Sequence, residues 1–176
     1  AEQLAEALNA DGYKVRIVAN NKKPNDNLGG LVLCANDNPD KQWLLGTFTL
    51  MQACSASLKK SKGFLAAVTT LGGSFGFDGS IKGQPIQAGL YGLIKTADKE
   101  WSDVTVKSID VDLDAVSAAS LKEELFYEGP LEVGLLDGQV MSVSLEVEAL
   151  ESEKTEHTLL NQEDLIVISG GARGVT

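Results

Sequence analysis

The residues best suited to chemistry are Tyr91 and Lys95, which stand four positions apart in Tyr91-Gly-Leu-Ile-Lys95. On a helix, residues at i and i+4 lie on one face, and a cation beside a phenol lowers its pKa. Such a tyrosine can act as the general acid in the reduction of a carbonyl group. Thr69 or Thr70, at the end of the preceding predicted strand, could supply a partner hydroxyl. One hypothesis is therefore a reductase that uses these residues.

A packing role for the same residues is the stronger interpretation. A reductase needs a cofactor loop between its first strand and first helix, but no glycine cluster precedes the predicted helix 2–10. The segment between Tyr13 and Leu31 is also too short for the usual extra strand and helix. We therefore expect Tyr91 to pack in a helix interface and Lys95 to be solvated, and we assign no catalytic residue to this chain.

The second candidate is a glycine-rich stretch that follows the apolar run Leu165–Ile168. Such a run is typical of a parallel strand, and glycines after it let backbone N–H groups approach a pyrophosphate. Binding would require the helix that normally follows this loop, so we expect it only in a full-length protein. In this chain we expect a disordered tail and no bound cofactor. The predicted cofactor-binding residues are Gly170, Gly171, Arg173 and Gly174.

Other clusters fit metal or phosphate chemistry poorly. Asp110, Asp112 and Asp114 alternate at a strand end but lack the glycine-centred loop and later glutamate of a calcium site. We expect a solvated strand end and a helix cap there, and no metal site. The loop 72–76 follows a strand without a helix directly after it, which favours a mobile loop over a phosphate cradle. Cys34 and Cys54 have apolar neighbours and are expected to be reduced, buried thiols.

Helical and strand periodicities alternate along most of the chain, which predicts an α/β fold on a mainly parallel sheet. Helices are predicted over 2–10, 41–60, 87–101 and 115–127, the last with Asp114 as its N-cap. Strands are predicted over 13–19, 31–35, 63–69 and 104–111, with a hairpin over 131–145 around Asp137-Gly138. An acidic, polar stretch follows from Glu146 to Glu163.

The composition is that of a folded domain. The 176 residues are 43% hydrophobic and 23% charged, which suits a chain with a core of its own. The net charge of −10 argues against a nucleic-acid or anionic-membrane surface. We see no signal peptide, and no apolar run approaches the ~18 residues of a membrane span. We expect a cytoplasmic protein.

The segment Ala88–Trp101, followed by Lys107-Ser-Ile-Asp-Val-Asp112, resembles the non-catalytic half of a polyketide-synthase-type ketoreductase. In that family a degenerate reductase domain, the structural subdomain, precedes the catalytic one. The hairpin sequence 131–140 is similar to the end of such subdomains. The stretch 169–176 is similar to the start of the catalytic subdomain, especially in large bacterial polyunsaturated fatty acid synthases. The resemblance covers 2–176.

The resemblance implies a truncated Rossmann-like, short-chain-dehydrogenase-like sheet with helices on both faces and a C-terminal hairpin. It implies a structural subdomain over 1–150, a linker over 151–163, and the first strand and glycine loop of a catalytic subdomain over 164–176. The parent synthase would reduce a β-ketoacyl group, held on the phosphopantetheine arm of an acyl carrier protein, with NADPH. The implied partners are the catalytic subdomain of the same chain and the carrier domains. An interdomain docking module is a further alternative.

Overall fold

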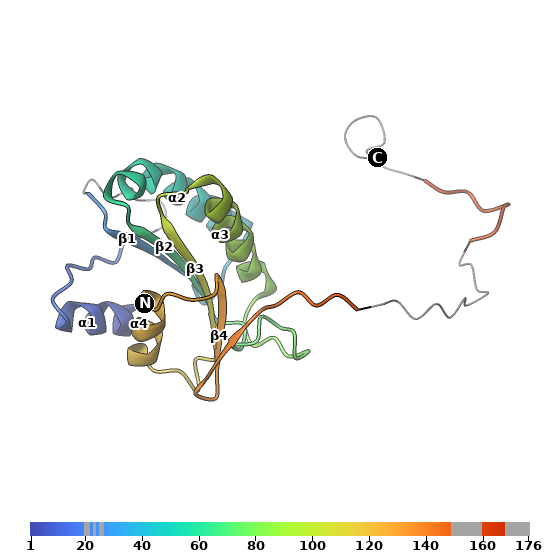
Figure 1. Ribbon diagram of the computed structural model, residues 1–176. Helices are drawn as coiled ribbons and strands as arrows, with labels where there is room; N and C mark the ends of the chain where they lie inside the picture. Colours follow the sequence, from blue (N-terminus) through green and yellow to red (C-terminus); the bar gives the residue numbers. More distant parts are fainter. Residues whose placement is uncertain (20–21, 23, 25–26, 149–159, 168–176) are drawn as a thin grey trace. The chain divides into compact units, whose positions relative to one another are not determined.

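The computed structural model describes residues 1–19, 22, 24, 27–148 and 160–167. The chain divides into two units, Ala1–Ser144 and Leu145–Thr176, which are described separately. All helices and strands among the described residues lie in the first unit (Figure 1). The subdomain and linker boundaries expected from the sequence stay predictions.

The first unit is built on a five-stranded sheet in the order β1-β2-β3-β4-β5. The first four strands run parallel and the last is antiparallel to its neighbour. This arrangement confirms the predicted α/β fold with a terminal hairpin and is compatible with a truncated Rossmann-like sheet. The strands are β1 (Gly30–Cys34), β2 (Phe64–Thr69), β3 (Thr105–Val111), β4 (Glu132–Leu136) and β5 (Gln139–Ser142).

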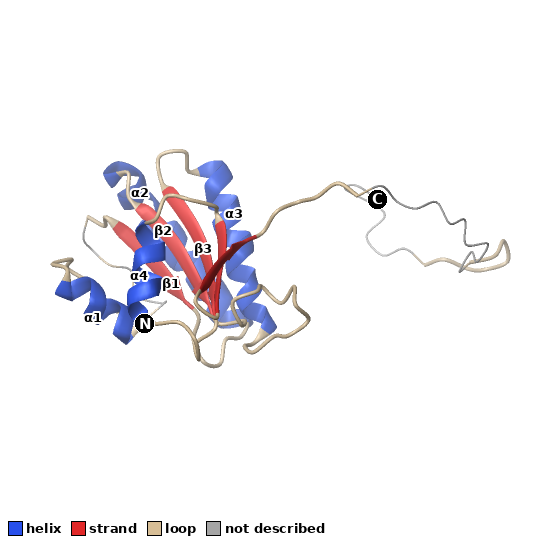
Figure 2. Cartoon of the chain, turned by 60° about the horizontal axis from the view of Figure 1, so that its bottom comes forward, coloured by secondary structure: helices blue, strands red, loops and turns tan. Residues whose placement is uncertain are grey.

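Helices cover both faces of the sheet, as Figures 1 and 2 show. Apolar side chains of α2 and α3 form one core with β1 and β2. Side chains of α1 and α4 form a second core with β2, β3 and β4 on the opposite face. The sheet is therefore buried on both sides, as parallel sheets are. The helices are α1 (Glu2–Ala10), α2 (Lys41–Ser61), α3 (Gly89–Glu100) and α4 (Ala118–Phe126), with a 3-10 turn η1 (Pro85–Ala88) before α3.

Local sequence signals account for two of the boundaries. Helix α2 begins after Asp40, whose carboxylate accepts a hydrogen bond from the Trp43 amide at 2.7 Å and so satisfies one of the free amides of the first turn. The β4–β5 hairpin turns through Asp137 and Gly138, with φ angles of 49° and 72°. Both residues are in the left-handed region, as the two central residues of a type I′ hairpin turn must be.

Three predicted elements were wrong. Residues Tyr13–Ala19 form no strand, because no described segment pairs with them; Tyr13 instead stacks on Phe126 of α4. Helix α4 begins at Ala118, since Ser117 rather than Asp114 caps it by accepting from the Ser120 amide at 3.1 Å. In the second unit, 165–167 are exposed and form no strand, because an apolar run becomes a strand only when a ladder partner is present.

Candidate functional site

Three side chains from three elements meet at the carboxyl end of the sheet. Thr69 ends β2 and stands opposite Asp110 of β3 in the parallel register, while Tyr91 comes from α3. The Thr69 hydroxyl donates to the Asp110 carboxylate at 2.7 Å and shares a hydrogen bond with the Tyr91 hydroxyl. Thr69 and Asp110 are fully buried and Tyr91 nearly so. The structure therefore brings together Thr69 and Tyr91, the residues suggested by the spacing, and adds a carboxylate.

The Asp110 carboxylate also holds the glycine-rich loop that follows β2. One of its oxygens accepts from the Leu71 amide at 2.8 Å, and the other accepts from the amides of Gly73 and Phe75 at 2.8 and 2.9 Å. Positive φ angles at Gly72, Gly73 and Phe75 (117°, 84° and 57°) turn these amides inward. The loop is thus a backbone cradle for an anion, and the anion is a side chain of the protein itself.

Two predictions about these residues were wrong. The loop was expected to be mobile, but residues 71–74 are buried and three of the loop amides bind Asp110. Asp110 was expected at a solvated strand end, yet it is fully buried. The physical reason is the same in both cases, since a buried carboxylate requires several donors and a buried loop requires acceptors for its amides.

The loop lies directly against the end of β4. A Cβ atom added to Gly134 would stand 2.0 Å from the carbonyl oxygen of Gly73, and one added to Gly73 would stand 2.3 Å from that of Leu135. The Phe75 ring meets the Tyr91 ring edge to face, with centroids 4.9 Å apart. The loop therefore packs on both β4 and the tyrosine ring.

Lys95 does not activate the Tyr91 phenol in this arrangement. Its ammonium forms an ion pair with Glu132 of β4 at 2.8 Å and is half exposed. Burial raises the pKa of Tyr91 above its usual range, and the nearby Asp110 carboxylate adds to the increase, although the Thr69 hydrogen bond acts the other way. The phenol is thereby held protonated, whereas the catalytic hypothesis needs a tyrosine with a lowered pKa.

A polar cleft of about 340 Å³ opens beside this network, at the carboxyl ends of the parallel strands. Thr70, the other candidate hydroxyl, lines the cleft, and its amide donates to the buried side chain of Gln87 at 2.8 Å. The Lys82 ammonium, also in the cleft, donates to both oxygens of Asp112 at 2.8 Å and to Asp114 at 3.2 Å. These contacts hold the pKa of Asp112 below its usual range. The cation of the cleft is therefore already neutralised.

The alternating aspartates consequently have separate partners. Asp110 binds the loop, whereas Asp112, also predicted to be solvated, is nearly buried beneath Lys82. Asp114 is exposed and contributes only the outer contact to Lys82. Within the described part of the chain, no group of three or more histidine, cysteine or acidic residues could hold a metal ion.

Sequence reasoning missed Lys107, which is buried in β3. Its ammonium donates to the backbone carbonyls of Glu124 and Tyr127, each at 2.8 Å, and forms an ion pair with the Glu124 carboxylate. It thereby binds free carbonyl groups at the end of α4, where a cation is favoured. The available signal was a lysine inside the predicted strand 104–111, within two positions of Val106 and Ile109.

Several predicted features lie outside the described residues. These are Gly170, Gly171, Arg173 and Gly174, together with most of the predicted linker. Cys54 is buried and Cys34 is partly buried, and burial raises the pKa of the Cys34 thiol. Among the helices that the structure describes, none is long and apolar enough to cross a membrane.

Comparison with known proteins gives one informative similarity. The chain is 31% identical over 194 residues to a polyunsaturated fatty acid synthase protein from Thraustochytrium sp.. The match covers 98% of this chain but only 7% of the length of that protein. No protein-family model and no solved structure match the chain. The chain is therefore related to a small segment of a polyunsaturated fatty acid synthase.

Proposed function

We propose that this chain is a structural subdomain that supports the NADPH-dependent β-ketoacyl reductase of a multienzyme polyunsaturated fatty acid or polyketide synthase. The chain itself performs no reduction. The observation that carries this proposal is the buried network of Thr69, Tyr91 and Asp110. Its hydroxyl groups bind one another and a carboxylate, so they are committed to internal contacts rather than to a substrate.

The described residues also do not fit a dinucleotide. A pyrophosphate needs free backbone amides or cations, but the amides of Leu71, Gly73 and Phe75 already bind Asp110. The cleft beside them contains Lys82, whose charge is offset by Asp112 and Asp114. A pyrophosphate placed there would meet two carboxylates and a neutralised cation. NADPH would instead be bound by the catalytic half of the parent synthase.

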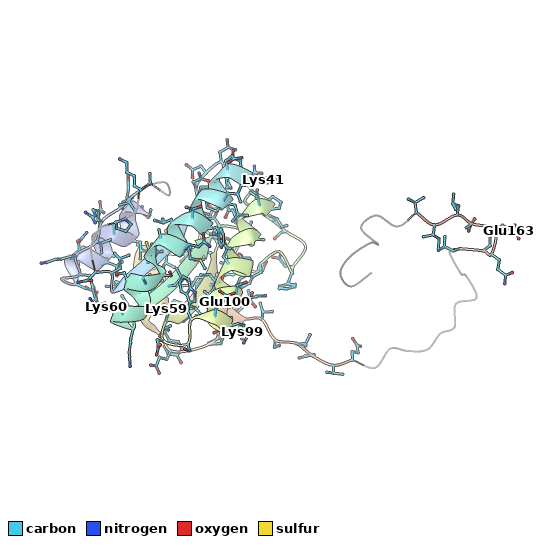
Figure 3. The ribbon with its side chains drawn as sticks, turned by 90° about the horizontal axis from the view of Figure 1, so that it is seen from above. Lys41, Lys59, Lys60, Lys99, Glu100 and Glu163 are labelled. Atoms are coloured by element: carbon cyan, nitrogen blue, oxygen red, sulfur yellow. The ribbon has the colours of Figure 1, made fainter. Side chains whose placement is uncertain are left out.

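The mechanical role rests on the outer surface of α2 and α3. Between Lys41 and Lys59, α2 has no charged residue, although one side of the helix faces outward. Leu45 and Phe48 on that side are 47% and 39% exposed, and space is open above Gly92 of α3. Figure 3 shows charged residues at the ends of α2 and α3, namely Lys41, Lys59, Lys60, Lys99 and Glu100. This α2–α3 face, which is uncharged along α2 and has charged side chains at the helix ends, has the composition of a protein interface.

In the proposed assembly the α2–α3 face packs against the corresponding helices of the catalytic reductase half. The contact would bury the exposed apolar side chains and hold the catalytic half in a fixed conformation. Fully burying an exposed leucine or phenylalanine side chain gains roughly 1.5–3 kcal/mol, and Leu45 and Phe48, already more than half buried, would gain about half of that each. A few such contacts are enough to stabilise a domain whose own stability is modest.

The first test is cofactor binding by the chain alone. NADPH is titrated into the protein and followed by calorimetry and by cofactor fluorescence, up to millimolar concentration. We expect no binding. Saturable binding together with β-ketoacyl reduction that is lost in Tyr91→Phe would replace the structural role with the reductase hypothesis.

The second test addresses the α2–α3 face in the whole synthase. The double variant Leu45→Asp/Phe48→Asp should lower NADPH-dependent ketoreduction about tenfold or more, because two carboxylates would be buried at the interface. The matched control is Ile17→Asp, which alters an aliphatic side chain of similar exposure away from α2 and α3. Equal activity of the two variants would contradict the proposed interface.

A further inference from the structure

The alternation of apolar and polar residues that begins at Met141 in β5 continues past Ser142, where the strand ends. β5 pairs with β4 from Gln139, opposite Leu136, to Ser142, opposite Val133. The ladder ends one residue short of Glu132, where β4 begins after the sequence Gly129-Pro130-Leu131. Residues 143–148 therefore have no strand partner among the described residues.

This overhanging segment, 143–148, has the composition of a half-buried strand. Val143, Leu145 and Val147 alternate with Ser144, Glu146 and Glu148, and the segment contains neither glycine nor proline. Strict alternation with branched apolar residues is typical of a strand with one covered face. Here the apolar side chains are 39%, 96% and 97% exposed, so the face that the pattern predicts to be covered is open.

The register of β5 shows which side of the sheet a continued strand would present. Met141 opposes Gly134, and in a continued ladder Val143 would oppose Glu132. Glu132 forms its ion pair with Lys95 of α3, whereas Val133 and Leu135 pack in the core with α1 and α4. Because opposed residues share a face, Val143 in a continued ladder belongs to the α3 side of the sheet, and the alternation gives Leu145 and Val147 the same face of the segment as Val143.

We propose that residues 143–148 add as a strand to an exposed sheet edge of the catalytic reductase half, which also covers Val143, Leu145 and Val147. The identity of this partner rests on the proposed function. A strand edge is the fitting partner because it satisfies both the alternating side chains and the unpaired backbone groups. The segment also lacks lysine and proline, the residues that most often keep other strands from adding to an edge.

The charges of the segment argue against a second copy of this chain as the partner. Antiparallel pairing of two identical segments centred on Glu146 would place Glu146 opposite its own copy, with Glu148 close by, and like charges directly opposed are destabilising. The net charge of −10 opposes such a dimer further. Glu146 and Glu148 instead predict lysine or arginine side chains on the facing positions of the partner strand.

Hydrogen–deuterium exchange measured by mass spectrometry tests the proposal on the chain alone and on the whole synthase. The amides of 143–148 should exchange at least about tenfold more slowly in the synthase than in the isolated chain. Equal exchange in both proteins would overturn the proposal. Slow exchange in the isolated chain that becomes slower still with rising protein concentration would show that a second copy is the partner, and would overturn it as well.

A pair of variants in the whole synthase separates strand addition from general disturbance. Leu145→Asp/Val147→Asp should abolish the protection of 143–148, whereas Ser144→Asp, on the opposite face, should retain it. Loss of protection in Ser144→Asp alone would contradict the face assignment. If 143–148 are protected but Leu45→Asp/Phe48→Asp leaves the synthase activity unchanged, the strand addition stands and the proposed function is rejected. If that double variant lowers the activity but 143–148 are not protected, the strand addition alone is rejected.

Discussion

Replacing Asp110 by asparagine tests whether the carboxylate organises the carboxyl end of the sheet. The side chain accepts four hydrogen bonds, from the Thr69 hydroxyl and from the amides of Leu71, Gly73 and Phe75. All four groups are donors. An asparagine of the same shape has only one oxygen, so its NH₂ group must face either the amides of Gly73 and Phe75 or the Leu71 amide and the Thr69 hydroxyl, and only the hydroxyl can turn to accept from it.

The magnitude follows from the bonds that are lost. Two hydrogen bonds to a charged acceptor disappear in Asp110→Asn, and each contributes about 1.5–3 kcal/mol. The expected loss of unfolding free energy is therefore roughly 3–6 kcal/mol, before any relaxation of the loop. A domain of this size is stable by about 5–15 kcal/mol, so the variant should be close to unfolding or should open its glycine loop.

Urea unfolding, followed by the fluorescence of Trp43 and Trp101, measures this loss. The control is Asp103→Asn, the same chemical change at an exposed carboxylate, which should alter the unfolding free energy by less than about 0.5 kcal/mol. Hydrogen exchange of the amides of Leu71, Gly73 and Phe75 should accelerate in Asp110→Asn and not in the control. A stability of Asp110→Asn within about 1 kcal/mol of the parent would refute the role assigned to the carboxylate.

The remaining predictions concern neighbouring buried groups. Lys107→Met should lower the unfolding free energy by about 3–5 kcal/mol because it leaves the Glu124 carboxylate buried without its partner; Lys107→Met/Glu124→Leu should recover much of the loss in urea unfolding, and no recovery would contradict the pairing. The raised pKa of Tyr91 means that the folded state favours the neutral phenol. The stability that this preference contributes is fully present below the unfolded pKa of about 10 and is lost as pH rises above it. Between pH 8 and pH 10.5, Tyr91→Phe should lose less unfolding free energy, measured in urea, than the parent protein does. An equal loss in both proteins would contradict this prediction. Gly134→Ala should lower the thermal midpoint markedly, because its Cβ would meet the Gly73 carbonyl at 2.0 Å; a midpoint equal to that of Ala119→Gly, an exposed control on α4, would argue against the tight contact.

The local patterns of the sequence were sufficient for the elements that are specified by neighbours along the chain. Each of three local signals predicted its element to within a few residues: the apolar runs of β1 and β2, the long stretch of helical periodicity in α2, and the Asp137-Gly138 turn. Burial on both faces and left-handed turn geometry are properties that short stretches encode directly. The relationship to a polyunsaturated fatty acid synthase agrees with the resemblance noted in the sequence.

Only the tertiary structure decided which groups meet across the sheet. Tyr13–Ala19 has the alternation of a strand but no partner edge among the described residues, so its pattern alone could not make it one. Asp110 carries no local sign that it will bind amides 35 to 39 positions earlier in the chain. The raised pKa of Tyr91 likewise follows from burial of its phenol beside Asp110, and Lys95 pairs with Glu132 instead. Hydrogen-bond partners of this kind are set by the parallel register and by burial, and both exist only once the strands have assembled.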